Sequence, residues 1–236
     1  MKITIINGSP RKGNTYAATQ IFKNEMATCG EVIFAEFFLP QDMPQFCIGC
    51  MSCFDKGENT CPHSEYTLAI LESILGADAI IFTTPVYVVQ TTGAVKAFLD
   101  HYGFLFIGHR PHLEMFGKKA FVISTTAAAG TKEAIKTIVT SLKFWGINRI
   151  YSLGFIMRAE SWGTIKPKRK VKFESKLKKS ARRFYKEVAS GKKRRPYLFT
   201  RMMYTVCRIM IKGYDETTSL DKRYWMEKGL FGKSPF

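Results

Sequence analysis

The 236-residue sequence lacks an apolar run long enough to span a bilayer, which takes about 20 consecutive residues. It shows no signal peptide at its start, because Lys2 is followed directly by a short apolar stretch and a polar loop. It also lacks an internal repeat, a Ser/His/Asp arrangement and a paired-carboxylate motif. The absence of side-chain catalytic motifs favours chemistry that a cofactor carries.

Acidic residues are scarce, with 19 against 36 lysines and arginines, which gives a net charge of +17. The excess is local, because residues 166–195 hold 15 basic and 2 acidic residues and the rest of the chain carries only +4. This distribution disfavours a specific nucleic-acid surface built into the fold. It leaves open a basic appendage that binds polyanions.

Six cysteines in a chain without a visible signal peptide predict a reducing compartment, which we expect to be the cytoplasm. In such a compartment the cysteines are thiols or metal ligands, and structural disulfides are not expected.

Apolar runs typical of strands alternate with patterns typical of helices. The runs predict strands at 2–7, 31–38, 78–84, 119–125 and 147–156 and helices at 14–27, 64–76, 92–106, 131–144 and 168–189. Such alternation predicts an α/β fold, a doubly wound five-stranded parallel sheet covered on both faces. We expect this domain over residues 1–160, followed over 161–236 by a basic final helix and a helical C-terminal extension.

The segment after the first strand predicts an anion-binding loop. Asn7 to Thr15 joins the strand to a helix, and it offers free N–H groups, the hydroxyls of Ser9 and Thr15, and the charge of Arg11 and Lys12. The spacing of the P-loop and that of the dinucleotide motif G-x-G-x-x-G are both absent. A phosphate-bearing ligand is one interpretation, and an ordinary polar turn is the other.

Two more loops follow strand ends, Thr83–Tyr87 and Thr125–Gly130, and both are rich in small or hydroxyl residues. Ligands of doubly wound sheets bind at the carboxyl ends of the strands. Three converging loops of this kind therefore predict a binding site for a flat ligand.

These motifs resemble those of the NAD(P)H-dependent FMN reductase and iron–sulfur flavoprotein group of flavodoxin-like proteins. The resemblance lies in Gly8-Ser9-Pro10-Arg11 with Gly13-Asn14-Thr15, in Pro85-Val86-Tyr87 with Gly93, Lys96 and Asp100, in His109-Arg110-Pro111 before Gly117-Lys118, and more weakly in Asp221–Trp225. It implies an FMN site at Ser9, Arg11, Asn14, Thr15, Pro85, Val86, Tyr87, Val88, Thr125, Thr126, Ala127 and Gly130.

Four cysteines follow the spacing C-x2-C-x2-C-x7-C, at Cys47, Cys50, Cys53 and Cys61. Thiolates at every third residue can surround one metal cluster, and this loop resembles the [4Fe–4S] motif of iron–sulfur flavoproteins. Zinc, free thiols or a redox-labile disulfide remain alternatives. Among the histidines, His101 is expected on a helix surface and His109 in a structural or interface role.

The C-terminal segment Tyr197–Ile211 predicts a helix that is apolar except for a narrow polar stripe at Arg201, Thr205, Arg208 and Lys212. Such a helix needs a partner. It could pack on the domain or across a dimer. Alternatively, residues 166–212 could contact a membrane surface as an interfacial helix beside a polybasic segment.

The resemblance implies an FMN-dependent oxidoreductase that passes electrons from NAD(P)H to a small-molecule acceptor such as a quinone or free flavin. One alternative is an iron–sulfur flavoprotein that receives electrons from ferredoxin through the cluster. An alternative of another class is a basic-tailed protein that binds an anionic membrane or nucleic acid. We also expect a homo-oligomer.

Overall fold

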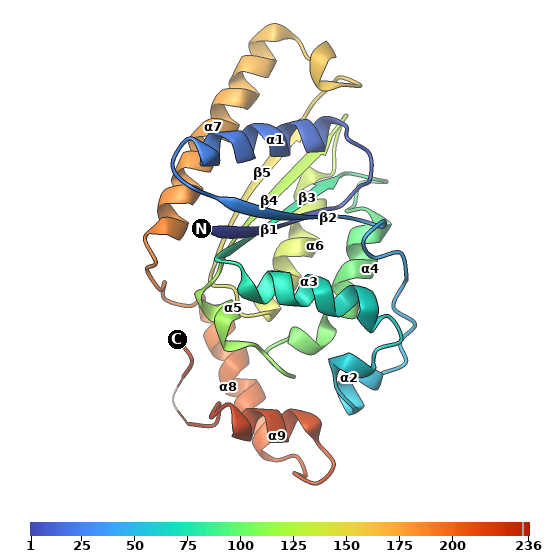
Figure 1. Cartoon of the computed structure of the whole chain (residues 1–236), viewed down its shortest axis with the longest axis vertical. Coiled ribbons are helices and arrows are strands. Elements are labelled where there is room, and N and C mark those ends of the chain that lie inside the picture. Colours follow the sequence, from blue (N-terminus) through green and yellow to red (C-terminus); the bar gives the residue numbers. More distant parts are fainter. Residues whose placement is uncertain (233) are drawn as a thin grey trace.

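The computed structural model describes residues 1–232 and 234–236 and contains a five-stranded parallel sheet in the order β2-β1-β3-β4-β5 (Figure 1). The strands are β1 (Lys2–Asn7), β2 (Ile33–Phe38), β3 (Ala79–Pro85), β4 (Lys119–Thr126) and β5 (Arg149–Ile156). This order is that of flavodoxin-like proteins, and its switch point lies between β1 and β3. The predicted fold class is confirmed.

Helices cover both faces of the sheet (Figure 1). On one face lie α1 (Asn14–Ala27) and α7 (Pro167–Ala189), and on the other lie α3 (Ser64–Gly76), α4 (Gly93–His101) and α6 (Thr131–Phe144). Because successive strand side chains point to opposite faces, Ile5 packs in the core with α1 and α7, while Ile6 packs in the core with α3, α4 and α6.

The expected element boundaries agree with the structure to within two residues at most positions. The expected helix over 92–106 instead ends at His101, and a 3-10 turn, η2 (Gly103–Leu105), follows. The last of the expected helices begins at Pro167, where a proline costs no hydrogen bond because the first turn has no acceptor for its N–H. Because α7 packs along α1, it belongs to the α/β layers. The boundary at residue 160 stays a prediction.

The short elements were not expected from the sequence. They are α2 (Ser52–Asp55), η1 (Glu58–Thr60), α5 (Leu113–Gly117), η3 (Trp162–Thr164) and α9 (Leu220–Glu227). The expected C-terminal helix is α8 (Leu198–Lys212), and it packs with α9 at the lower end of the molecule in Figure 1. These two helices share a small core with Ile107 and Phe116. In the part of the chain that the structure describes, every helix is too short or too polar to cross a membrane.

Gly8 lies where the loop after β1 passes closest to β3 and α4. A Cβ at Gly8 would lie 2.4 Å from Val95 Cγ2 and 2.6 Å from the carbonyl oxygen of Thr83. The carbonyl of Gly8 accepts a hydrogen bond from Thr92 Oγ1 at 2.7 Å, and its N–H donates to Thr83 O at 2.7 Å. The start of the loop is therefore held between the backbone of β3 and the side chains of Thr92 and Val95, which leaves no room for a side chain at Gly8.

We expect Gly8→Ala to lower the free energy of unfolding by about 1–3 kcal/mol, the usual cost of overpacking, because the Thr83 carbonyl cannot move without disturbing β3. Denaturant titration measures this change. The matched control is Gly93→Ala, since a Cβ at Gly93 meets no atom within 4 Å. Equal stability of the two variants would contradict the account.

Candidate functional site

A cavity of about 440 Å³ opens at the carboxyl ends of the strands, next to the switch point. The segment after β1 contributes the largest share of its lining residues, and the carboxyl ends of β3, β4 and β5 with their loops contribute the rest. Its lining consists of Ser9, Arg11, Gly13, Asn14, Thr15, Pro85, Tyr87, Thr125, Thr126, Ala127, Met157, Ala159 and Glu160. Nine of the twelve residues expected to bind FMN therefore line one cavity.

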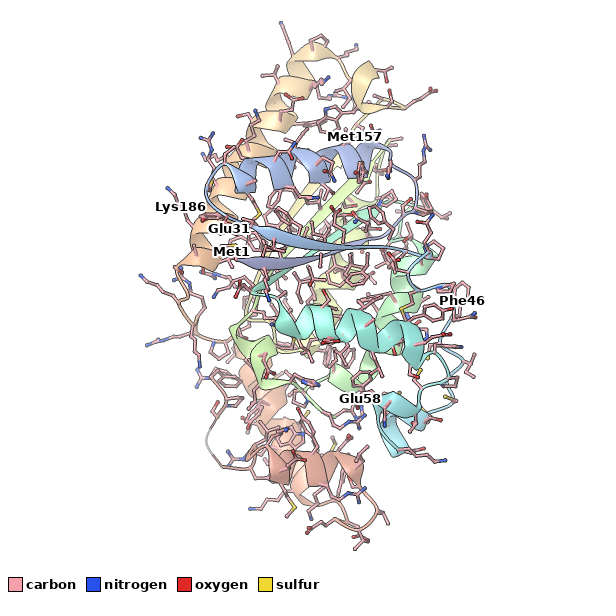
Figure 2. The ribbon with its side chains drawn as sticks, viewed as in Figure 1. Met1, Glu31, Phe46, Glu58, Met157 and Lys186 are labelled. Carbon is pink, nitrogen blue, oxygen red and sulfur yellow. The ribbon has the colours of Figure 1, made fainter. Side chains whose placement is uncertain are left out.

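Four lining residues were outside the expected set. One, Gly13, lies within the predicted anion-binding loop, and the other three are Met157, Ala159 and Glu160. These three follow β5, whose carboxyl end lies at the same sheet edge as those of β1, β3 and β4. The rule that selected the other loops therefore also applies to this one. Figure 2 labels Met157 beyond the end of β5, close to the start of α1.

The loop after β1 forms a tight turn that leads directly into α1. The Arg11 N–H donates to Ser9 Oγ at 3.2 Å, and the Gly13 N–H donates to the Arg11 carbonyl at 2.9 Å. The first intrahelical bond runs from the Ala17 N–H to Gly13 O, so the N–H groups of Asn14, Thr15 and Tyr16 precede it. Free N–H groups and the positive end of the helix dipole make this helix start suited to an anion.

Asn14 and Thr15 tie the anion loop to the neighbouring strand ends. Asn14 Nδ2 donates to the carbonyls of Ala159 and Glu160 at 3.3 Å, and the hydroxyls of Thr15 and Thr125 are 2.7 Å apart. Within the described residues, the buried Asn14 Oδ1 has no hydrogen-bond partner. The amide of Asn14 thus holds the wall of the cavity, and its oxygen is left free to accept a hydrogen bond from a ligand.

The three expected residues that do not line the cavity are Val86, Val88 and Gly130, and they lie in or beside the turn that follows β3. Val88 and Val89 both have positive φ, at 48° and 64°, and form a tight turn closed by hydrogen bonds between Tyr87 and Gln90. This conformation is costly for β-branched residues, and it points Val88 into solvent, with 95% of its surface exposed. Gly130 packs beneath the turn, where a Cβ would lie 2.7 Å from Val86 Cγ1.

The four cysteines of the C-x2-C-x2-C-x7-C motif surround a second, smaller cavity. Its volume is about 60 Å³, and it is lined by Cys47, Cys50, Cys53 and Cys61 together with residues that include His63 and His101. Gly49 and Met51 have positive φ, at 66° and 60°, and these two bends turn the loop back on itself. All four cysteines are free thiols.

The thiols differ in their environment. Burial and the neighbouring cysteines raise the pKa of Cys53 to about 11, whereas hydrogen bonds to Ser52 lower the pKa of Cys50. Cys50 is exposed and Cys53 is half-buried. In the absence of a metal, Cys50 is therefore the more readily ionised and more reactive of the two.

His101 was expected on a helix surface, and this expectation is wrong. It lies 3% exposed on the inner side of α4, where its Nδ1 donates to the Ala97 carbonyl at 2.9 Å. Its Nε2 therefore accepts from His63 Nδ1 at 3.0 Å. Burial lowers the pKa of His101, in keeping with a neutral ring. Cys61, His63 and His101 each place one potential metal-ligand atom within 4.8 Å of the others. The imidazoles of His63 and His101 therefore lie beside the Cys61 thiol.

A buried guanidinium holds the cysteine segment in place. Arg110, 3% exposed, donates to the carbonyls of Cys53 and Phe54, and it forms an ion pair with Asp221 at 2.7 Å. A weaker contact reaches Glu58 Oε2 at 3.4 Å. Arg110 thereby joins the cysteine segment to α9, two parts of the chain separated by more than 150 residues.

The other residues of the motifs His109-Arg110-Pro111 and Asp221–Trp225 make further contacts between the same two segments. His109 Nδ1 lies 2.8 Å from Asp221, and its carbonyl accepts a hydrogen bond from Trp225 Nε1 at 2.7 Å. The hydroxyl of Tyr224 donates to the Pro111 carbonyl at 3.0 Å. The His109-Arg110-Pro111 motif and the Asp221–Trp225 motif are therefore the two halves of one contact, and His109 has the structural role that was expected.

The sheet order and the cavity at its switch point define a flavodoxin-like α/β protein. Residues 1–157 match the family model of NADPH-dependent FMN reductases, and the chain belongs to that family.

Curated relatives of this chain include two archaeal proteins. One, an iron–sulfur flavoprotein of Archaeoglobus fulgidus, is 28% identical over 233 residues, which cover 98% of this chain and all of the relative. The other, an iron–sulfur flavoprotein of Methanocaldococcus jannaschii, is 27% identical over 194 residues, or 78% of this chain and 96% of the relative.

Solved structures share the fold at low sequence identity. An FMN-dependent NADH-azoreductase of Bacillus anthracis, solved in complex with FMN, aligns with a TM-score of 0.59 at 15% identity over 78% of this chain and all of that one. An apo NADH:FMN oxidoreductase aligns with a TM-score of 0.57 at 18% identity over 79% of this chain and 89% of that one.

We expect Asp221→Ala to lower the free energy of unfolding by about 3 kcal/mol, because removing one partner of a buried ion pair leaves the Arg110 charge with only the weaker contact to Glu58. Hydrogen exchange of residues 47–58 should also accelerate, since Arg110 donates to their carbonyls. The matched control on the same helix is Glu227→Gln, whose exposed pair with Lys228 contributes little. Unchanged exchange in the Asp221→Ala variant would show that α9 does not hold the cysteine segment.

Proposed function

We propose that this chain is an FMN-dependent oxidoreductase that takes electrons from NAD(P)H and passes them to a small acceptor, such as a quinone or free flavin. The observation that carries the proposal is the cavity at the switch point, which combines a helix start suited to phosphate with hydroxyl-rich loops suited to a polar, flat ligand. The family to which the chain belongs supports it.

The residues of the cavity fit FMN in size and in chemistry. A volume of about 440 Å³ lies within the usual range for sites of small ligands. Ser9, Arg11 and the first N–H groups of α1 are suited to hold a phosphate. The unpartnered Asn14 Oδ1 is suited to accept a hydrogen bond from a ligand hydroxyl. The unpartnered Asn14 Oδ1 is an observation of this structure, and it supports the site independently of the family match.

Bound FMN would supply the hydride-accepting chemistry. Among the described residues that line the cavity, Glu160 is the only acidic residue, and there is no histidine. The lining therefore offers few acid–base groups, and we assign to its side chains the binding and orientation of the cofactor. Tyr87 stands at the rim, half exposed, where an aromatic ring can lie against a flat ligand. Thr125, Thr126 and Ala127 line the same cavity with small side chains that allow a close approach of the backbone.

We expect Arg11→Ala to weaken FMN binding by about 1–3 kcal/mol, the value of a hydrogen bond to a charged group, which raises the Kd by about 5- to 150-fold. Fluorescence quenching of added FMN measures the Kd. Lys12→Ala is the matched control. It removes the same charge from the next residue, which does not line the cavity, and it should weaken binding less. Equal Kd values for wild type and Arg11→Ala would contradict the assigned phosphate site.

The second candidate function is electron transfer through an iron–sulfur cluster, with ferredoxin as the electron donor. Four free thiols around one cavity favour it, since four thiolates are the donor set of a [4Fe–4S] cluster. The names of the archaeal relatives support it. The cluster residues would be Cys47, Cys50, Cys53 and Cys61, with Arg110 holding the carbonyl of Cys53.

We expect anaerobically reconstituted protein to hold about four irons per chain, as a [4Fe–4S] site requires. Cys50→Ser should lose iron while FMN binding is retained, because Ser9 to Thr15 lies in a different cavity. Iron and sulfide assays measure the first effect and flavin quantification the second. Cys29→Ser, which alters a thiol outside the motif, should keep its iron. If wild type bound FMN but no iron, the first proposed function would stand without the second.

A further inference from the structure

The helix α8 has two contrasting faces. One face, made by Thr200, Tyr204, Cys207 and Ile211, is buried against the rest of the molecule. The opposite face carries apolar side chains at helical spacing that remain in solvent. The sequence left open whether this helix packs on the domain or across a dimer, or contacts a membrane surface; in the structure one face packs on the domain and the other is exposed.

The outward face is strongly exposed. Leu198 exposes 79% of its surface, Ile209 70% and Val206 54%, with Met202 and Met210 beside them. Residues 198, 202, 206 and 209 recur at three- and four-residue intervals, so they form a continuous row along the helix. A row of this kind on a water-exposed helix is typical of a surface that contacts another protein or a membrane.

Positive charge borders this row. Arg201, Arg208 and Lys212 are exposed on the same helix, along one edge of the apolar row, and α8 contains no acidic residue. The four residues from Lys192 to Arg195, which precede the helix with only Pro196 and Tyr197 between, are also basic and exposed. An apolar row with a basic border is the pattern of a helix that lies in the interface of an anionic membrane.

Contacts on both sides of α8 hold it in a fixed position. The hydroxyl of Tyr197, at the start of the helix, accepts a hydrogen bond from the Ile150 N–H at 3.2 Å. Tyr204 donates to the Leu230 carbonyl at 2.5 Å and stacks on Trp225, with ring centroids 5.3 Å apart. The apolar row is therefore presented by a helix that is already folded and anchored, so contact with a surface requires no further ordering of its backbone.

We propose that the outward face of α8 docks on an anionic lipid bilayer, with Leu198, Met202, Val206 and Ile209 in the headgroup boundary and the bordering basic residues on lipid phosphates. Charge complementarity selects this occupant. The chain carries +17 in total, and 13 of these charges are concentrated in residues 166–195 just before α8, which attracts the molecule toward a negative surface.

Two other occupants fit the face less well. A second copy docked antiparallel through the same face would bring the basic border of one copy, Arg201, Arg208 and Lys212, alongside that of the other, because a two-fold interface pairs the same surface of both copies. Nucleic acid would satisfy the charges through its phosphates, but it would leave Ile209 and Leu198 without an apolar partner.

The test is co-sedimentation of the full-length, FMN-loaded protein with vesicles of phosphatidylcholine alone and with vesicles that also contain phosphatidylglycerol. Wild type should bind only the anionic vesicles, and high salt should weaken binding. The double variant Val206→Glu/Ile209→Glu should bind the anionic vesicles at least about tenfold more weakly than wild type. The matched control, Ile33→Glu/Leu113→Glu, makes the same change of charge at exposed apolar residues outside α8 and should bind nearly as wild type does.

A second readout reports contact directly. In the Ile209→Trp variant, the fluorescence emission of the new tryptophan should shift to the blue when anionic vesicles are added. Retained FMN shows that each variant is folded. Three results would overturn the proposal: equal binding to both kinds of vesicle, full binding by Val206→Glu/Ile209→Glu, or light scattering in which that variant converts a wild-type dimer into a monomer. The last result would assign the face to a second copy.

Discussion

The constraint on which the rest of the structure depends is the change of direction between β1 and β3. These strands are neighbours, yet the helices that follow them cover opposite faces of the sheet, so their loops diverge and leave a cavity at the strand ends. The cavity can form only if the loop after β1 passes close to β3, and Gly8 makes this approach possible. From there the chain enters α1, whose first N–H groups face the cavity edge and give it an affinity for anions.

The second site is linked to the first through α4. At its start, Thr92 binds the carbonyl of Gly8, and at its end His101 borders the cysteine cavity. The helix has nine residues, so its two ends are about 13 Å apart. The ion pair between Arg110 and Asp221 connects the C-terminal extension to the cysteine segment. The extension therefore has two sides with different properties, one that holds the cysteine segment through α9 and one, on α8, that leaves apolar side chains in solvent.

The sequence was sufficient for the sheet, for most helix boundaries and for the nine lining residues, because these depend on local periodicity and on the common edge where parallel strands end. It was insufficient for contacts between distant segments. Nothing in the spacing of Arg110 and Asp221 indicates that they form an ion pair across 111 positions. The burial of His101 could have been predicted, since it follows Val95 and Phe98 at intervals of three on the buried side of α4. The positive φ of Val88 could not, because valine disfavours that conformation.

We propose that one chain holds two cofactor sites, an FMN site at the switch point and a cluster site at the cavity lined by the four cysteines. The most direct measurement is a crystal structure of anaerobically reconstituted, FMN-loaded protein with anomalous data collected at the iron absorption edge. The account predicts a flavin phosphate at Ser9 to Thr15 and an anomalous peak among Cys47, Cys50, Cys53 and Cys61. Flavin density away from the strand ends, or an iron peak outside the cysteine segment, would contradict it.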